Sequence, residues 1–232
     1  MGQRQPASLL ERFWLSDWSL SALLALLIID GFVLAPLLES EQAPRVVAPV
    51  VFSLIIVSGI AVTFRSRVTT ALIGALAAVS LAVRWANHVH PNDTLALADA
   101  LLTLAFLLML VAVLLVQVFR AGPVTLHRVQ GAIAVYLLLA YGWAMVYELV
   151  AMGDPAAFSF PATGIGLQRL FARLLYFSTV TLTTVGYGDI TPVSPVARSL
   201  ATLEALTGQL FPAILLARLV SMELYHRQQG DR

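Results

Sequence analysis

Long apolar runs that are almost free of charged residues place the strongest limit on what this chain can fold into. A helix must offer about 20 mostly apolar residues to cross the hydrocarbon core of a bilayer. Six stretches approach or exceed this length: Leu20–Leu38, Val46–Phe64, Thr69–Trp85, Leu95–Phe119, Val129–Ala151 and Val196–Leu224. Because backbone groups find no water inside a bilayer, each run is expected to be helical. The sequence therefore predicts an all-α, multi-pass protein of the cell membrane, in contact with membrane lipids.

The composition agrees with that prediction and excludes several classes of function. Charged residues make up only 12% of the chain, whereas soluble domains carry about 25%. A net charge of +1 gives no reason to expect a nucleic-acid partner. The chain has no cysteine, which excludes disulfides and cysteine-bound metals. It also lacks the HExxH, GxSxG and Walker-loop motifs. We therefore expect neither an enzyme nor a cofactor.

The arginines predict the orientation of the chain, since short cytoplasmic loops are enriched in positive residues. A cytoplasmic N-terminus places nine arginines inside and five outside. Both termini are then cytoplasmic. Residues 1–18 are expected to form an interfacial amphipathic helix, and residues 225–232 a short cytoplasmic tail.

A short polar segment interrupts the apolar pattern between the fifth and sixth runs. The apolar stretch from about Leu170 to Thr183 is too short to cross, so it is predicted to be a re-entrant helix. The sequence TVGYG follows it, and non-helical backbone at membrane depth is tolerated where it lines a watery path. Gly186 and Gly188 permit backbone angles that a Cβ forbids. Successive oxygens can then face one axis and replace the water around a potassium ion. The predicted ligands are Thr184, Val185, Gly186, Tyr187 and Gly188, with the Thr184 hydroxyl innermost.

The stretch TTVGYGD closely resembles the filter of the tetrameric potassium channels, for which TVGYG is the known signature. The resemblance runs from about Val129 to Leu224, and the first four runs match the six-span members in topology only. It implies six transmembrane helices, a re-entrant pore helix and a selectivity filter. Residues 19–127 would form a four-helix domain like a voltage sensor, and residues 128–224 the pore domain. Potassium would pass through such a pore passively.

One filter segment per chain decides the expected assembly. A ring of carbonyl oxygens needs four contributions, and this chain supplies one. We therefore expect a homotetramer around a central axis. The opening stimulus is left open, and an unidentified regulatory subunit is among the possibilities.

The resemblance also assigns residues that support the filter. Glu148 matches an acidic position that props the filter from behind, and Asp189 matches the aspartate of the outer mouth. Asp189 is expected to concentrate cations and to tether the filter to the pore helix. Tyr176 and Phe177 stand where the family often has two tryptophans. Phe177 cannot donate a hydrogen bond to Tyr187, so a looser clamp is expected.

A hinge is predicted in the sixth run. Gly208 matches the hinge glycine of the family, and Pro212 has no N–H for the Gly208 carbonyl to bind. A kink at this turn would let the inner part of the helix swing and gate the pore. A static kink used for packing is the alternative. Glu204, one turn earlier, either faces the cavity or pairs with a neighbouring helix.

The fourth run lacks the arginine ladder that voltage sensing requires. It contains no arginine before Arg120, so little voltage sensitivity is expected. Asp30, Arg84 and Asp99 fall in the outer half of the first, third and fourth runs. We expect them to form an ion-pair cluster that offsets their burial, in preference to a ligand or proton site.

Two other functions remain open. A nonselective cation channel of the same architecture is one, although the filter tyrosine Tyr187 argues against it. A potassium transporter or a non-conducting partner subunit is the other. Reversal potentials in mixed potassium and sodium would test the first, and flux driven by a potassium gradient alone would test the second.

Overall fold

The structure is a computed structural model that describes residues 18–39, 46–62, 67–120, 125–161 and 167–230. Its elements in chain order are α2 (Trp18–Ile29), the π-helix η1 (Asp30–Leu34), α3 (Ala35–Glu39), α4 (Val47–Val62), α5 (Arg67–Val89), α6 (Asp93–Val118), α7 (Leu126–Gly153), β1 (Phe158–Ser159), α8 (Leu167–Leu182), β2 (Thr191–Pro192) and α9 (Pro195–Gly230). The predicted interfacial helix at residues 1–18 lies almost wholly outside the described residues. The expected tail overlaps α9, which stays helical to Gly230.

The described helices confirm a mostly helical, multi-pass membrane protein. Five of them are long and apolar enough to cross a bilayer: Ser19–Leu37, Thr70–Val89, Asp93–Val118, Leu126–Gly153 and Pro195–Met222. The second predicted run differs, because its described apolar helix covers only Val47–Ile60. The run predicted to end at Phe64 continues into residues that the structure does not describe.

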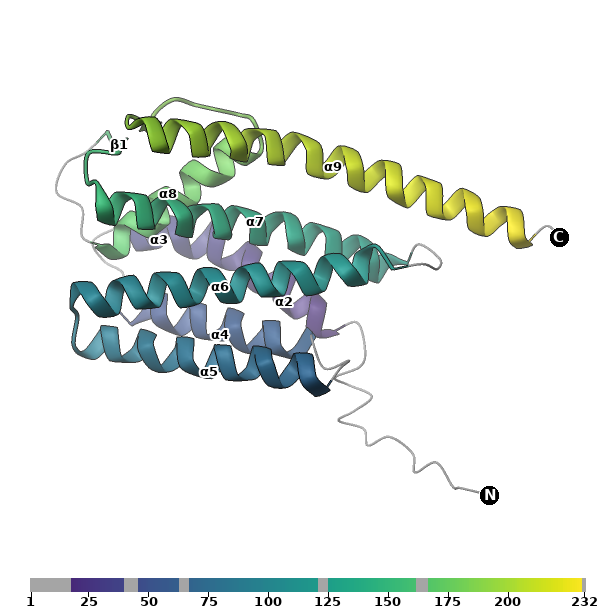
Figure 1. The fold of residues 1–232 in the computed structure, drawn as a ribbon, viewed down its shortest axis with the longest axis horizontal. Coiled ribbons are helices and arrows are strands. Elements are labelled where there is room, and N and C mark those ends of the chain that lie inside the picture. Colours follow the sequence, from purple (N-terminus) through teal and green to yellow (C-terminus); the bar gives the residue numbers. More distant parts are fainter. Residues whose placement is uncertain (1–17, 40–45, 63–66, 121–124, 162–166, 231–232) are drawn as a thin grey trace, which may run out of the picture.

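The helices form a bundle with the α7–α9 region on one side (Figure 1). α6 packs along both α5 and α7, and α2 packs against α4 and α7. α8 crosses between α7 and α9, and α3 also reaches it. The first four runs thus dock on α7 and α8 of their own chain.

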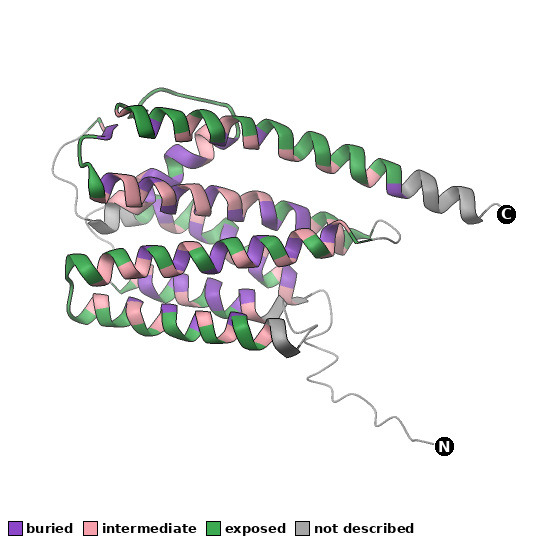
Figure 2. Cartoon of the chain, viewed as in Figure 1, coloured by how far each residue is buried: buried purple, intermediate pink, exposed green. Residues whose placement is uncertain are grey.

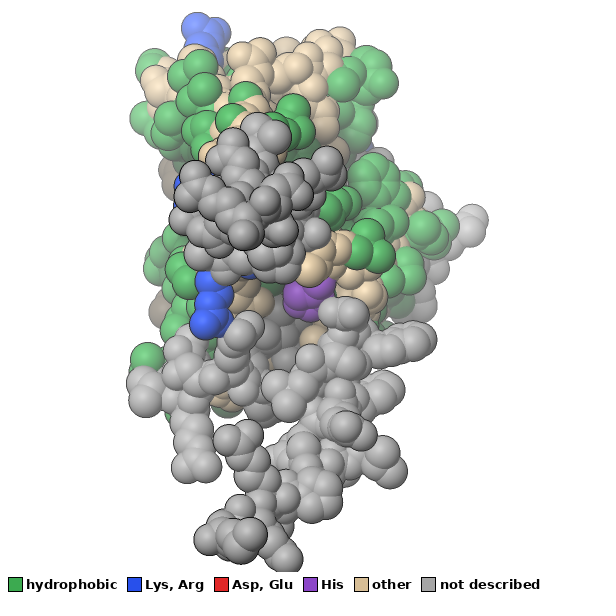
Figure 3. All heavy atoms as spheres, turned by 90° about the vertical axis from the view of Figure 1, so that its right-hand side faces the viewer, with side chains coloured by type: hydrophobic (Ala, Val, Ile, Leu, Met, Phe, Trp, Pro, Cys, Tyr) green, Lys and Arg blue, Asp and Glu red, His purple; other side chains and the backbone are tan. Residues whose placement is uncertain are grey.

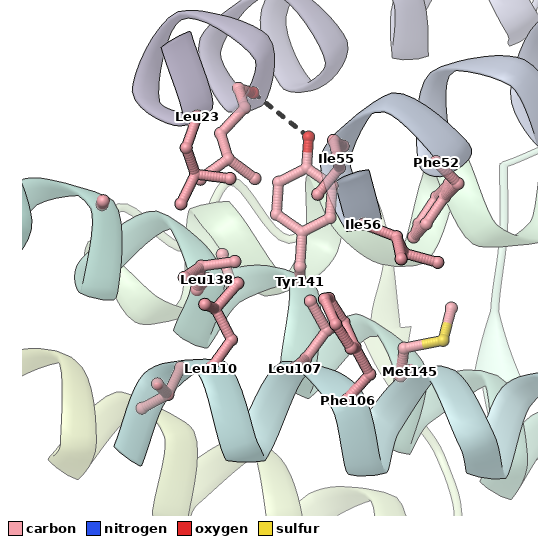
Figure 4. Close-up of a cluster of buried hydrophobic side chains, with 14 of the residues drawn as sticks. Leu23, Phe52, Ile55, Ile56, Phe106, Leu107, Leu110, Leu138, Tyr141 and Met145 are labelled. Carbon is pink, nitrogen blue, oxygen red and sulfur yellow. Dashed lines mark hydrogen bonds between the residues drawn. The ribbon is translucent and has the colours of Figure 1, made fainter. Parts of the chain in front are cut away.

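Buried side chains gather where these helices face one another, while α9 is largely exposed (Figure 2). Figure 4 shows the central cluster, in which residues of α2, α4, α6 and α7 converge around Tyr141. The Tyr141 hydroxyl lies within hydrogen-bond distance of the Leu27 carbonyl (3.1 Å) and the Asp30 carboxyl group (2.7 Å). Asp30 opens η1, the π-helical turn inside the first run, so a buried polar contact marks the point where the α-helical pattern changes.

Candidate functional site

The backbone after α8 alternates in handedness over the TVGYG sequence. Thr184, Gly186 and Gly188 have φ angles of 61°, 59° and 80°, and Thr184 is the one non-glycine residue with positive φ in the described chain. In an ordinary strand, successive carbonyls point to opposite sides. Alternating left-handed residues turn every second peptide plane over, which lets successive carbonyls face the same side. Such a conformation is required if successive carbonyl oxygens are to face one axis, as the sequence predicts.

The last turn of α8 holds the beginning of this segment. The backbone N–H groups of Val185 and Gly186 donate to the Val180 carbonyl, at 3.0 and 3.3 Å. The N–H of Thr184 donates to the carbonyl of Thr181 at 3.0 Å. The segment therefore starts directly at the negative, C-terminal end of the helix.

The residues that follow the TVGYG segment are tied to α8 and to β1, the short strand that precedes α8 in the chain. The Tyr176 hydroxyl donates to Asp189 Oδ2 at 2.7 Å, and the N–H of Ile190 donates to Asp189 Oδ1 at 3.0 Å. The hydrogen bond from Tyr176 is the main reason that the pKa of Asp189 lies below its ordinary value. β1 and β2 pair antiparallel, with Phe158 opposite Pro192. Asp189 thus has its link to α8 through Tyr176.

Phe177 turns the other way, into an aromatic cluster behind α8. Its ring lies 5.1 Å from that of Tyr147 and 5.6 Å from that of Phe158. Tyr176 and Phe177 therefore point to different sides of α8, and their expected clamp on Tyr187 stays a prediction. One faces the mouth, and the other anchors the helix in the protein interior.

Glu204, on α9, contacts α8 from the protein interior. It is fully buried, and its carboxyl group binds the hydroxyls of Tyr147 on α7 and Ser178 on α8. Of the two alternatives left by the sequence, pairing with neighbouring helices is the one observed. No sequence signal identified Ser178 and Tyr147 as partners, because a polar contact between separate helices depends on their packing.

Glu148, the acid predicted to support the filter, lies near charged residues of α5 and α6. Its electrostatic neighbours are Arg84 and Asp99, on α5 and α6. Consecutive residues of a helix point about 100° apart, so Tyr147 and Glu148 face different neighbours. The structure records no contact between Glu148 and the described filter residues, and its supporting role stays a prediction.

The expected ion-pair cluster is confirmed between Arg84 and Asp99. Arg84 Nη2 lies 3.1 Å from Asp99 Oδ1 and donates to the Thr103 hydroxyl at 2.8 Å. The guanidinium also lies over the Phe52 ring, with its central carbon 4.3 Å from the ring centre. Asp30 is within electrostatic range of Arg84, but its recorded hydrogen-bond partner is Tyr141.

The predicted hinge lies against the end of α8. A Cβ on Gly208 would approach the Leu182 carbonyl oxygen to 1.8 Å, so the two backbones touch. The Tyr136 hydroxyl donates to the same oxygen at 3.1 Å, and its ring stacks on Phe211. α9 remains one helix through Pro212. Gly208 thus has a packing role, and its role as a gating hinge stays a prediction.

Large apolar side chains of this region are uncovered in the single chain. Tyr187 is 73% exposed and Val185 is 52% exposed. The apolar window of α9 is only 11% buried, whereas that of α7 is 50% buried. The exposed apolar residues on α9 are Val196, Leu203, Leu206, Leu210, Ile214, Leu216 and Val220.

Comparison with known proteins identifies the region that contains this site. Residues 133–224 match the family described as Ion channel. The protein LctB of Bacillus caldotenax is 38% identical over 87 residues, which cover 37% of this chain and 64% of LctB. The two pore potassium channel c of Oryza sativa subsp. japonica is 49% identical over 90 residues, covering 38% of this chain and 20% of that protein.

A third relative is the inward rectifier potassium channel Kirbac3.1 of Paramagnetospirillum magnetotacticum. It is 34% identical over 92 residues, which cover 40% of this chain and 27% of Kirbac3.1. The chain spans less than two thirds of the length of each of these three relatives. The match to a family of ion channels agrees with the expectation that the chain is not an enzyme. Residues 133–224 thus match the ion channel family, and the relatives matched there include proteins named as potassium channels, in agreement with the resemblance noted in the sequence.

Proposed function

We propose that this protein is a potassium-selective channel through which K⁺ passes down its electrochemical gradient. The observation that carries the proposal is the alternation of left-handed residues at Thr184, Gly186 and Gly188 directly after α8. Carbonyl oxygens of residues 184–187 would replace the hydration shell of the ion, with the Thr184 hydroxyl as the innermost ligand. Asp189 at the mouth would raise the local concentration of cations.

The functional unit is a homotetramer. Each chain offers one filter segment, and oxygen from one side cannot surround an ion. The exposure of Tyr187 and of the apolar face of α9 supports this assembly, because both would be covered by neighbouring chains and lipid. Four copies around an axis place the four segments face to face.

We include α4 as a crossing helix, which gives six spans in all. α2 and α5 are both long enough to cross, and α4 follows α2 in the chain and packs beside both. Its 16 described residues extend roughly 24 Å at 1.5 Å per residue, close to the hydrocarbon thickness of about 30 Å.

Both termini are placed in the cytoplasm. The start of α2, the end of α6, the start of α7 and the C-terminal part of α9 lie at one end of the molecule (Figure 1). Figure 3 looks onto that end, where arginine (blue) and histidine (purple) show among the described atoms in view without an acidic side chain (red). Arg120, His127 and Arg128 belong to these helix ends. A positive surface of this kind favours the cytoplasmic side.

Little voltage dependence is proposed for the first four runs. α6 carries no arginine, and Arg84 on α5 is bound to Asp99. A charge that stays in one place does no work in the membrane field.

The experiment is flux from purified protein in liposomes, driven by a potassium gradient alone. The wild-type protein should conduct K⁺, and Gly186→Ala should abolish conduction because a Cβ is strained at φ 59°. Gly153→Ala is the matched control, since nothing lies within 4 Å of its Cβ position. Unchanged flux in Gly186→Ala contradicts the filter assignment. Equal permeability to sodium would instead indicate the nonselective alternative, and flux that needs a second gradient would indicate a transporter.

A further inference from the structure

The hydrogen bonds around Glu204 account for one more proton than an ionised carboxylate allows. Ser178 Oγ lies 2.8 Å from the Ala140 carbonyl and also binds Glu204 Oε1. The Ser178 hydroxyl is placed to donate to both oxygens but has a single proton, and the Ala140 carbonyl has no proton of its own, so we assign the Ser178 proton to Ala140. The contact between Ser178 and Glu204 then needs a proton from the carboxyl group. Tyr147 fills the other oxygen, Oε2, as a donor.

The charges around Glu204 lead to the same protonation state. The residue is fully buried, and the groups that act on its carboxyl group are the hydroxyls of Ser178 and Tyr147, with no cation among them. The phenols that face Glu204 are Tyr147 and, at longer range, Tyr136, and both are neutral at pH 7. A buried carboxylate without a cation is strongly disfavoured, whereas a hydrogen-bonded carboxylic acid is not.

Glu204 also makes one of two regularly spaced contacts between α8 and α9. α9 touches α8 at Glu204–Ser178 and again at Gly208–Leu182. Both helices advance by four residues between the two contacts, so the contacts lie about 6 Å apart along each axis. The second contact, between Gly208 and Leu182, lies at the last residue of α8, just before the proposed filter segment. The pair of contacts therefore fixes how α8 lies against α9.

We propose that Glu204 is a positioning residue which, as a neutral carboxylic acid, locks α8 onto α9 and so sets the placement of the filter. The proposal rests on the proposed channel function. In this proposal, the acid that supports the pore helix α8 comes from α9, which is also the helix predicted to move in gating. Potassium selectivity then depends on a hydrogen-bond donor and acceptor at position 204 and not on a negative charge.

Three variants separate these requirements. Glu204→Gln keeps a donor for Ser178 and an acceptor for Tyr147 without any charge. Glu204→Leu keeps much of the volume but removes both hydrogen bonds. Tyr147→Phe removes a single hydroxyl and serves if Glu204→Leu does not assemble. Asp93→Asn, at an exposed carboxylate on α6, controls for the change from acid to amide.

The first measurement is the ratio of potassium to sodium permeability, from reversal potentials of the reconstituted protein. Glu204→Gln should stay within about twofold of wild type, while Glu204→Leu should lower the ratio about tenfold through loss of two buried hydrogen bonds. Tyr147→Phe should fall between them. A role in stability alone would change thermal unfolding and leave this ratio unchanged. If Glu204→Gln loses selectivity as fully as Glu204→Leu, the charge matters and the proposal is wrong.

The second measurement is infrared spectroscopy of the wild-type protein and Glu204→Gln at neutral pH. Loss of a carboxylic-acid carbonyl band in the variant is expected, and loss of a carboxylate band would overturn the proposal. This result does not depend on conduction. If the wild-type protein carried no potassium, the channel function would fail, and the infrared difference would still decide the protonation of Glu204.

Discussion

Gly208 of α9 lies directly against the backbone of Leu182, the last residue of α8, with only 1.8 Å between the Leu182 oxygen and the place where a Cβ would stand. Gly208→Ala must therefore push α9 away from α8. Overpacking usually costs about 1–3 kcal/mol, and here the displaced helix leads directly into the segment that we propose as the filter. We expect lower thermal stability of the assembly and loss of potassium flux, measured on the same liposome preparations.

Gly74→Ala is the control for that substitution. Gly74 is also inside a helix, and nothing lies within 4 Å of its Cβ position. Alanine there should leave flux unchanged and raise stability by up to about 1 kcal/mol. Equal behaviour of the two variants would show that the contact between Gly208 and Leu182 is unimportant.

Removing Arg84 should destabilise the protein more than removing its partner. Asp99→Asn leaves one buried cation near two other acids, whereas Arg84→Met leaves Asp99, Glu148 and Asp30 without their shared cation. Breaking a buried ion pair costs about 3–5 kcal/mol, and Arg84→Met should reach the upper end. Unfolding temperatures in detergent give the order, and the double variant Arg84→Met, Asp99→Leu should recover part of the loss. A larger effect from Asp99→Asn would contradict the arrangement described here.

Tyr176→Phe should make the outer mouth more sensitive to acid. The Tyr176 hydroxyl is the first cause of the lowered pKa of Asp189. A lowered pKa means that the tether is present above the ordinary aspartate pKa and is lost as the pH falls through the lowered value. Without the hydroxyl, Asp189 should take up its proton at a higher pH. Flux during external acidification should therefore fall at a higher pH in Tyr176→Phe than in wild type.

Asp189→Asn provides the reference for this titration, because it cannot be protonated. Its flux should not respond to acid in the range where wild type and Tyr176→Phe differ. A response of the same size in Asp189→Asn would assign the acid effect to another group.

Open probability should vary only weakly with membrane voltage. Each charge that crosses the field contributes about 2.3 kcal/mol per 100 mV, and α6 offers only Asp93 and Asp99 as charged residues. Single-channel recording over a range of voltages tests this. A steep curve would mean that charge moves in a part of the protein other than α6.

The sequence predicted the helices and the unusual backbone of the TVGYG segment because both depend on local properties. Apolar length determines which segments can cross a bilayer, and two glycines spaced two apart mark where the backbone reverses its handedness. The faces of the helices could not be predicted in the same way. Glu148 and Tyr147 are neighbours in sequence, yet one faces Arg84 and the other binds Glu204. From the sequence, Gly208 was predicted to be a hinge. Only the packing of α9 on α8 shows that the missing side chain of Gly208 lets the backbones of the two helices approach closely.

Helices of the same polypeptide hold α8, and α7 and α9 do so through the hydrogen bonds among Tyr147, Ser178 and Glu204. In the proposed homotetramer, every protomer would thus bring its own complete support for α8. Damage to this scaffold should stay within the subunit that carries it. Mixing wild-type and damaged subunits should then yield a stepwise series of intermediate channels, instead of a single altered copy silencing the other three.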